Sequence, residues 1–124
     1  MEMKIELIPL QSVNLEDSKQ FYSEIMGFHL DHDVQPGNGV RVIQFTPPGS
    51  GCSIAIGKGI GTEGAAPVTG IHLVVDDIEA ARAELVARGL EISEVSDMGG
   101  VKYAHFNDPA GNGWELQQTF RGNL

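Results

Sequence analysis

Residues 100–109 of the chain read Gly-Val-Lys-Tyr-Ala-His-Phe-Asn-Asp-Pro, and residues 39–48 read Gly-Val-Arg-Val-Ile-Gln-Phe-Thr-Pro-Pro. At an offset of 61, the glycine, the valine, the phenylalanine and the final proline coincide. Each stretch is followed by a glycine-rich turn and then by a short segment of strand character, residues 52–56 and 114–118. This pattern is typical of two strands joined as a β-hairpin. The sequence therefore predicts two related hairpins.

The similarity extends to a helix before each hairpin. Asn14 and Asp77 stand where a helix N-cap accepts backbone N–H bonds. Gly27 and Gly89 suit the left-handed position that ends a helix. Apolar residues at helical spacing lie between these signals. Because the offset drifts from 63 through 62 to 61 while the order of elements is kept, we infer an internal duplication of a βαβββ module.

The duplication predicts a single domain of the α+β class over residues 1–124. Module one covers about residues 4–57, and module two covers about residues 70–119. The connector, residues 58–69, is rich in glycine and has little apolar periodicity, which is typical of a flexible link. The chain is long enough for one core and too short for a second full domain.

Composition limits the partners and the compartment. Seventeen acidic residues against eight basic ones give a formal net charge of −9. This charge repels phosphate backbones and anionic lipids, so we expect neither nucleic acid nor a membrane as a partner, and a positively charged ligand is favoured. Cys52 is the only cysteine, which excludes an intrachain disulfide. With no run of roughly 20 apolar residues to cross a bilayer, we expect a cytoplasmic protein.

Two further stretches carry a resemblance to a known family. Residues 14–28 are similar to the strand–helix opening of the vicinal oxygen chelate superfamily, which includes glyoxalases, bleomycin resistance proteins and extradiol dioxygenases. The segment Asp108-Pro109-Ala110-Gly111-Asn112 is similar to the turn before the last strand in the same superfamily. The resemblance covers about residues 4–119. It implies that the two modules form a cup-shaped mixed sheet, assembled as a homodimer, with a small organic molecule on the concave face. It does not decide the reaction, because one fold supports many functions.

Metal-using members of that superfamily take their ligands from the first and last strands of each module. The resemblance assigns these positions to Leu7, Ser53, Gly70 and Glu115. Leu7 and Gly70 have no side-chain donor and Ser53 is a poor one, whereas a tight divalent site needs at least three good donors. We therefore expect no metal at the usual site. Of the four residues, only Glu115 has a side chain suited to chemistry, either as a general base or as a binding partner for the amine of a ligand.

Two histidines offer a displaced site beside Glu115. Alternation along a strand puts His72 on the same face as Gly70, and His105 occupies a position that faces the cup in related antibiotic-modifying members. Glu115 and His105 are the candidate catalytic residues, and together with His72 they are the candidate ligands of any divalent metal that binds. The predicted ligand-binding residues are His72, Tyr103, Gln44, Gln11 and Gln117.

These residues are compatible with three functions. The first is a small-molecule binding protein of the glyoxalase/bleomycin-resistance type with no cofactor. The alternative is a metal-dependent lyase or dioxygenase of the same superfamily that uses the displaced site. The third is a partner-binding module recognised through the connector, residues 58–69. The sequence leaves open whether the protein is an enzyme.

Overall fold

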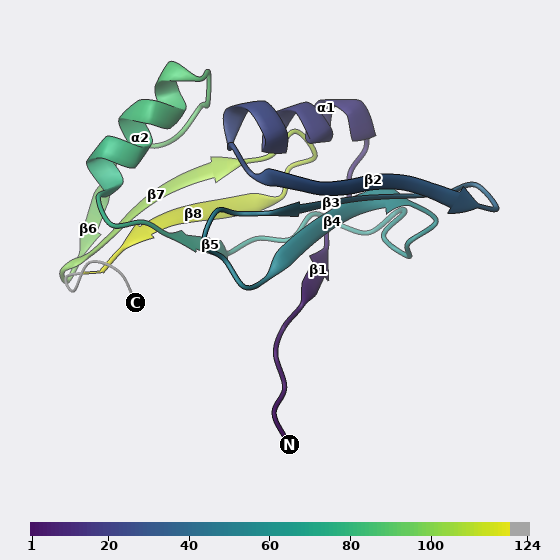
Figure 1. Cartoon of the computed structure of the whole chain (residues 1–124). Helices are drawn as coiled ribbons and strands as arrows, with labels where there is room; N and C mark the ends of the chain where they lie inside the picture. Colours follow the sequence, from purple (N-terminus) through teal and green to yellow (C-terminus); the bar gives the residue numbers. More distant parts are fainter. Residues whose placement is uncertain (120–124) are drawn as a thin grey trace. The chain divides into compact units, whose positions relative to one another are not determined.

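The computed structural model describes residues 1–119, which form two compact units, the first ending at Pro67 and the second beginning at Val68. Both units repeat the order strand, helix, strand, strand, strand. In each unit the four strands form one mixed sheet, and the helix lies over one face of that sheet (Figure 1). The predicted α+β fold with a duplicated βαβββ module is confirmed.

The first unit contains four strands and one helical segment. Its elements are β1 (Leu7–Pro9), α1 (Leu15–Gln20), η1 (Phe21–Ile25), β2 (His29–Gly37), β3 (Val40–Thr46) and β4 (Ser53–Lys58). The strand order is β1-β4-β3-β2, in which β1 runs parallel to β4 and the other neighbours are antiparallel. The β3–β4 pair is the first of the two predicted hairpins.

The second unit repeats this topology. Its elements are β5 (Ile71–Val74), α2 (Ile78–Ala87), β6 (Ser96–Met98), β7 (Val101–Asn107) and β8 (Gly113–Gln118). The order β5-β8-β7-β6 matches that of the first sheet, with β5 parallel to β8. The β7–β8 pair is the second predicted hairpin.

The helix ends follow the predicted caps. The Asn14 side chain accepts a hydrogen bond from the Asp17 N–H, and the Asp77 side chain accepts one from the Ala80 N–H, each at 3.0 Å. Both caps satisfy a backbone donor that the first helical turn leaves without an intrahelical partner. After Gln20 the first helix widens into η1, where the Met26 N–H bonds the carbonyl of Phe21 five residues earlier. The helical spacing was predicted; the widened turn was not.

Each core lies between the helix and the sheet of its own unit. In the first unit the buried Tyr22 ring from η1 lies 5.6 Å from the ring of Phe45 on β3. In the second, Phe106 and Trp114 stack at 6.1 Å and are at most 2% exposed. Because side chains alternate along a strand, their neighbours project from the opposite face, which no helix of the same unit covers. That open face of the second sheet carries the candidate site.

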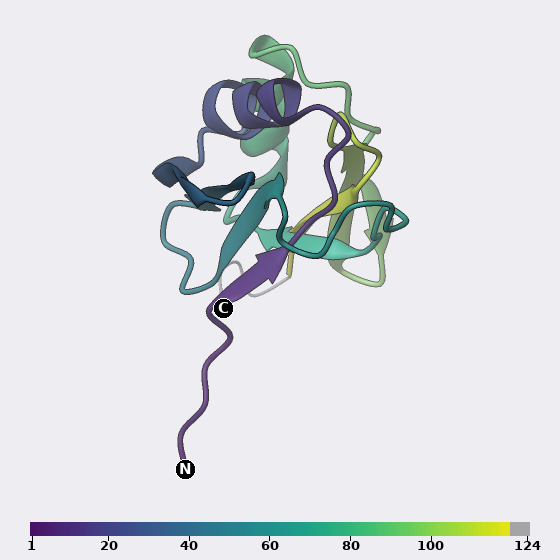
Figure 2. The ribbon, with the colours of Figure 1, turned by 90° about the vertical axis from the view of Figure 1, so that its right-hand side faces the viewer.

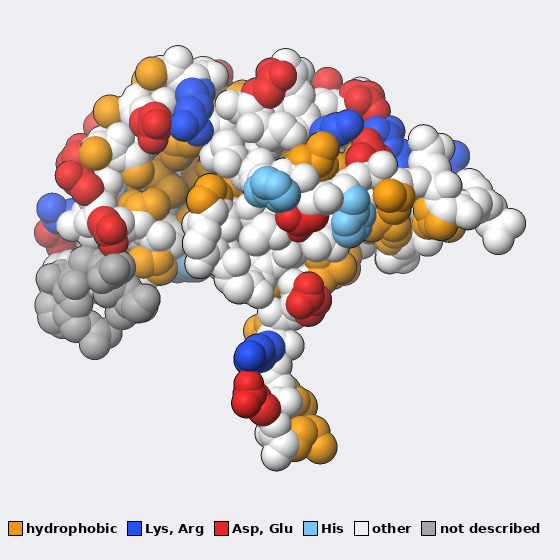
Figure 3. All heavy atoms as spheres, viewed as in Figure 1, with side chains coloured by type: hydrophobic (Ala, Val, Ile, Leu, Met, Phe, Trp, Pro, Cys, Tyr) orange, Lys and Arg blue, Asp and Glu red, His pale blue; other side chains and the backbone are white. Residues whose placement is uncertain are grey.

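The N-terminal segment, residues 1–6, leaves the first unit as an extended arm before β1 (Figures 1 and 2). Hydrophobic and charged side chains both project from this arm (Figure 3). Met1, Met3 and Ile5 are exposed by 109%, 82% and 67%. The arm therefore presents apolar side chains that the first unit does not bury.

Candidate functional site

The pairing of three strands brings together the three polar residues predicted from the sequence. His72 on β5 lies opposite Glu115 on β8, and Glu115 lies opposite His105 on β7. Residues directly opposite each other in neighbouring strands project from the same face of a sheet. His72, Glu115 and His105 therefore form one row on the open face of the second sheet. Tyr103 and Gln117, which are also paired, form the next row.

His105 and Glu115 form a hydrogen-bonded dyad. Their Nδ1 and Oε1 atoms are 3.0 Å apart, with 48% of the His105 side chain and 26% of the Glu115 side chain exposed. A carboxylate oxygen accepts, so this bond places a proton on Nδ1 of His105. In the neutral ring, Nε2 then carries a lone pair. The dyad therefore combines a fixed imidazole with a carboxylate that a ligand can reach.

His72 is held by contacts on two sides. Its Nδ1 atom lies 2.6 Å from Oε1 of Gln117, and its ring meets the Tyr103 ring edge-on at 5.8 Å between centroids. The amide oxygen of Gln117 also accepts, so the Nδ1 atom of His72 is the donor. Gln117 therefore orients a pocket residue, and Tyr103 contributes an aromatic wall.

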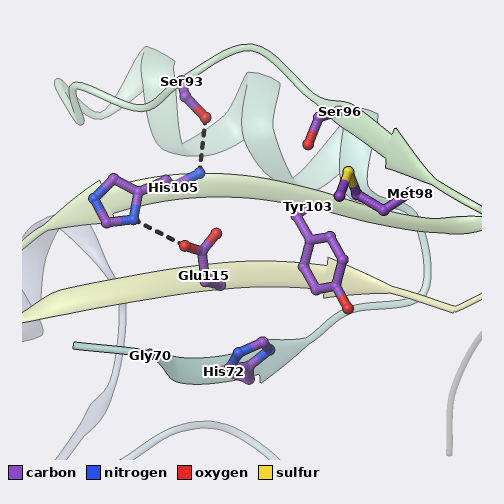
Figure 4. A pocket seen from close by; sticks show the side chains of 8 residues that line it. All are labelled: Gly70, His72, Ser93, Ser96, Met98, Tyr103, His105 and Glu115. Atoms are coloured by element: carbon purple, nitrogen blue, oxygen red, sulfur yellow. Dashed lines mark hydrogen bonds and ion pairs between the residues drawn. The ribbon is translucent and has the colours of Figure 1, made fainter.

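His72, Tyr103, His105 and Glu115 line a pocket of about 450 Å³ on the second unit, whereas the predicted ligand-binding residue Gln117 is not among the lining residues. Figure 4 shows Tyr103 and Met98 at one side, His105 and Glu115 at the other, and His72 on the neighbouring strand. The lining residues are Gly70, His72, Ser93, Ser96, Met98, Tyr103, His105 and Glu115. The pocket has the size range of small-molecule sites and mixes apolar surface with a few polar groups.

The segment before β6 supplies part of the lining and is held in place on two sides. The Ser93 N–H donates to the His105 carbonyl at 2.9 Å, and the His105 N–H donates to Oγ of Ser93 at 2.8 Å. From α2, the Arg82 guanidinium donates to the backbone carbonyls of Ser93 and Ile92 at 2.7 and 3.2 Å. This clamp fixes Ser93 beside the dyad.

The predicted turn before the last strand positions the start of β8. Asp108 and Asn112 are almost fully buried, and the Asn112 amide donates to Oδ2 of Asp108 at 2.9 Å. Oδ1 of Asn112 accepts from the Val68 N–H at 3.1 Å. Buried polar groups are stable only when paired, and both of these are paired. The turn thus ties β8 to the segment that leads into β5.

The strand pairing changes one correspondence between the two modules. In the first unit, Ala55 on β4 lies opposite both Gln44 on β3 and Pro9 on β1. In the second unit, Glu115 on β8 lies opposite both His105 on β7 and His72 on β5. Because the repeat matches His105 with Gln44, Glu115 corresponds to Ala55 and not to Ser53. His72 then corresponds to Pro9 at the offset of 63 that the helix caps show, so the first strands align as the caps predict.

The residues at the usual metal positions do not fit a divalent ion. Leu7 offers no donor, and the buried Ser53 hydroxyl is hydrogen-bonded to the Thr46 hydroxyl at 2.6 Å. Gly70 lines the pocket without a side chain, so Glu115 is the only strong donor of the four. Within residues 1–119, no three His, Cys, Asp or Glu side chains are grouped to hold a metal ion.

The remaining two predicted residues, Gln44 and Gln11, lie in the first unit. Gln44 donates to Oδ2 of Asp31 at 3.0 Å, and the Thr46 hydroxyl donates to the same oxygen at 2.6 Å. Hydrogen bonds from Thr46 and His29 lower the pKa of Asp31 to about 2. Gln44 thus supports a structural carboxylate, while Gln11 is half-buried just after β1.

Sequence reasoning missed part of the lining. Ser93, Ser96 and Met98 lie in a stretch without clear strand alternation. Only the pairing of this stretch with β7 brings it to the pocket. The one recognisable signal for this stretch comes from the repeat. The stretch precedes the β7–β8 hairpin in the second module, as β2 precedes the β3–β4 hairpin in the first.

Comparison with known proteins identifies relatives of the whole chain. Residues 4–116 match the model of the family described as Glyoxalase/Bleomycin resistance protein/Dioxygenase superfamily. No curated protein matches the chain significantly. No helix among residues 1–119 is long and apolar enough to cross a membrane.

Several solved structures share the fold. TnmS3, an antibiotic binding protein from Streptomyces sp. CB03234, is 30% identical, with a TM-score of 0.83 over 95% of this chain and 97% of that one. A glyoxalase/bleomycin resistance protein from the same organism is 31% identical, with a TM-score of 0.78 over 93% and 100% of the chains. A superfamily member from Sphaerobacter thermophilus DSM 20745 is 26% identical, with a TM-score of 0.79 over 94% and 97%.

Proposed function

The chain belongs to the glyoxalase/bleomycin resistance protein/dioxygenase superfamily, and we propose that within it the protein binds a small organic molecule without a divalent metal ion. One observation carries the proposal: a pocket of about 450 Å³ in which Glu115, His105, His72 and Tyr103 converge. The aromatic and thioether walls favour an organic ring, and the polar row favours a ligand with hydrogen-bonding groups. The similarity to an antibiotic binding protein supports an antibiotic-like ligand.

The electrostatic balance supports a ligand with a basic group. The chain has a formal net charge of −9, and the Glu115 carboxylate is reachable from the pocket. A ligand ammonium placed there would gain a charge-assisted hydrogen bond. The same negative charge disfavours nucleic acid, and the single cysteine is compatible with action in a reducing cytoplasm.

Metal independence is supported by the donors at the four family positions. Leu7 and Gly70 provide no donor atom, and the Ser53 hydroxyl is already bonded to Thr46. Glu115 alone cannot hold a divalent ion tightly, because such sites need several protein ligands. The chemistry available to the pocket is then hydrogen bonding and proton transfer at the His105–Glu115 dyad.

The experiment is a ligand screen followed by matched substitutions. Thermal shifts are measured with aromatic antibiotics, both cationic and neutral, because a ligand that binds only the native state raises its stability by RT ln(1 + [L]/Kd). For each hit, calorimetry compares wild type with Glu115→Gln and with Glu79→Gln on helix α2. Loss of a charge-assisted hydrogen bond predicts affinity about 10- to 100-fold weaker for Glu115→Gln and no change for Glu79→Gln.

Metal analysis decides between this function and a second candidate. His72, Glu115 and His105 lie in one row across β5, β8 and β7, which favours a metal-dependent lyase or dioxygenase at a displaced site. A metal ion at this displaced site would require Glu115 to give up its hydrogen bond to His105. Protein supplied with nickel, zinc, manganese or iron should contain no stoichiometric ion, and ligand binding should persist in EDTA. A stoichiometric ion that Glu115→Ala loses would replace the binding proposal with the enzymatic one.

A further inference from the structure

The hydrogen bonds around the pocket of the second unit engage the protons of its polar side chains. The Nδ1 proton of His105 is donated to Oε1 of Glu115, and the Nδ1 proton of His72 is donated to Oε1 of Gln117. In the neutral ring each histidine then offers a ligand only the lone pair of Nε2. The ionised carboxylate of Glu115 has no proton to donate. His72, Glu115 and His105 therefore meet a ligand as hydrogen-bond acceptors.

The Ser93 hydroxyl, which lines the same pocket, is also an acceptor. Its oxygen accepts the His105 N–H at 2.8 Å, and its proton is donated to the Glu94 carbonyl at 3.0 Å. A hydroxyl has one proton, so the lone pair left on Ser93 can only accept. Among the pocket-lining residues within 1–119, only the hydroxyls of Tyr103 and Ser96 add further side-chain donors. The lining therefore has more acceptors than donors.

The same pocket has no positively charged side chain that could meet an anion. Among its lining residues in the described part of the chain there is no Lys or Arg. Lys102 follows Tyr103 in the alternation along β7 and so projects from the opposite face of the sheet. The Arg82 guanidinium donates to backbone carbonyls of the segment before β6. A carboxylate or sulfonate group would leave the acceptors of the lining unpaired and would be repelled by Glu115.

We propose that the pocket recognises a hydroxylated amine, with the ligand ammonium at Glu115 and a neighbouring ligand hydroxyl at Nε2 of His72. This inference rests on the proposed ligand-binding function and names its ligand class. Glu115, the one charged acceptor, lies opposite His72 across neighbouring strands, which are about 4.8 Å apart. An amine and a hydroxyl on adjacent carbon atoms can each donate to one of two acceptors at that spacing.

The apolar part of the lining sets the order of the ligand's groups. The Tyr103 ring meets the His72 ring edge-on at 5.8 Å, and Tyr103 belongs to the row next to Glu115. In Figure 4, Tyr103 and Met98 lie at the end of the pocket away from His105. A ligand ring that packs against Tyr103 and Met98 brings a hydroxyl on the adjoining carbon to His72 and an amine one carbon further to Glu115. The pocket thus selects a ring, a hydroxyl and an amine in that order.

Nitrogen NMR tests the acceptor state of His72 before any ligand is added. Long-range ¹H–¹⁵N spectra of the full chain are recorded at pH 8.5, well above the ordinary pKa of a histidine side chain. They distinguish the protonated ring nitrogen from the unprotonated one. His72 and His105 should carry their proton on Nδ1, whereas exposed His32 on β2 should show both tautomers. A proton on Nε2 of His72 would overturn the proposal, because that nitrogen would then be a donor.

Three probes that share one skeleton test the ligand class. Phenylethanolamine has the ring, the hydroxyl and the ammonium group; phenethylamine lacks the hydroxyl; and phenethyltrimethylammonium keeps the positive charge without any N–H. Affinities are measured by titration of the full chain, followed through its backbone amide shifts. Loss of the hydroxyl should weaken binding about 3- to 10-fold, and loss of the N–H donors should weaken it a further factor of roughly 10 to 100. Phenylacetate, an anion of similar size, should not bind.

A matched substitution assigns the hydroxyl to its partner. His72→Phe keeps an aromatic ring beside Tyr103 and removes the acceptor, so it should bind phenylethanolamine and phenethylamine equally, while His32→Phe should behave as wild type. Equal affinities of wild type for the three amines, or a hydroxyl preference that His72→Phe retains, would refute the ligand class and leave the ligand-binding function standing. The same holds if an antibiotic from the screen binds and none of the amines does. If neither antibiotics nor amines bind, the proposed function itself fails.

Discussion

Asp31 offers a quantitative test of how the first sheet is held together. Its carboxylate accepts hydrogen bonds from the Thr46 hydroxyl and the Gln44 amide through Oδ2 and contacts Nδ1 of His29 through Oδ1. The Thr46 bond is the largest cause of the lowered pKa of Asp31, followed by the His29 bond. The substitution Asp31→Asn removes the charge while keeping the shape of the side chain.

The pKa shift sets the magnitude of the effect. A lowering from 3.8 to about 2 corresponds to a preference of about 2.5 kcal/mol for the ionised form in the folded state. Because 22% of the side chain is exposed to water, we expect a smaller loss of about 1–2 kcal/mol for Asp31→Asn at pH 7. The folded pKa lies below the unfolded one. The stabilisation is therefore present above about pH 4 and is lost as the pH falls through about 2.

The assay is urea unfolding of both proteins between pH 7 and the lowest pH at which they remain folded. The difference in unfolding free energy between wild type and Asp31→Asn should be present above about pH 4 and should shrink as the pH falls through about 2. Asp76→Asn, the same change at an exposed bend, should cost less than about 0.5 kcal/mol at any pH. A difference that does not change with pH, or one equal to that of Asp76→Asn, would refute the role of the carboxylate.

Two further predictions concern backbone packing and the pocket wall. A Cβ added at Gly57 on β4 would collide with the Arg41 carbonyl oxygen, so Gly57→Ala should lower stability by roughly 2–4 kcal/mol in thermal unfolding. Gly51→Ala, where no atom lies within 4 Å of the added Cβ, should have almost no effect, and equal melting temperatures for the two variants would contradict the close approach. Arg82→Gln should remove the clamp on Ser93 and Ile92, so the Ser93 amide should exchange with solvent faster than in wild type, whereas unchanged exchange would show that pairing with β7 alone holds the segment.

Local patterns in the sequence were sufficient to predict the helices and strands and the face that each of them buries. Alternation on the last two strands of module two places Phe106, Trp114 and Leu116 on the face opposite Glu115, and all three are buried. The caps at Asn14 and Asp77 follow from side chains that bond a donor three residues away. Such features depend on near neighbours in the chain, which is why a single sequence reveals them.

The repeat was a good guide to the topology and to the first strands, and a poor guide to the register of the last strands. Matching residues 52–56 with residues 114–118 makes Ser53 the counterpart of Glu115, whereas the pairs Gln44–Ala55 and His105–Glu115 make Ala55 the counterpart. The turn between the paired strands is one residue longer in module one. Pairing with the preceding strand, and not the local sequence, sets this register.

The sequence by itself determined that the chain contains two βαβββ modules, that Glu115 is the only strong donor left at the family's metal positions, and which residues share a face with it. These conclusions need only side-chain chemistry and the periods of strands and helices. The tertiary structure decided that His72, Glu115 and His105 form one row, that Glu115 is hydrogen-bonded to His105, and that Ser93 and Met98 complete the pocket. Pairing between distant strands sets those contacts, and no local pattern encodes it.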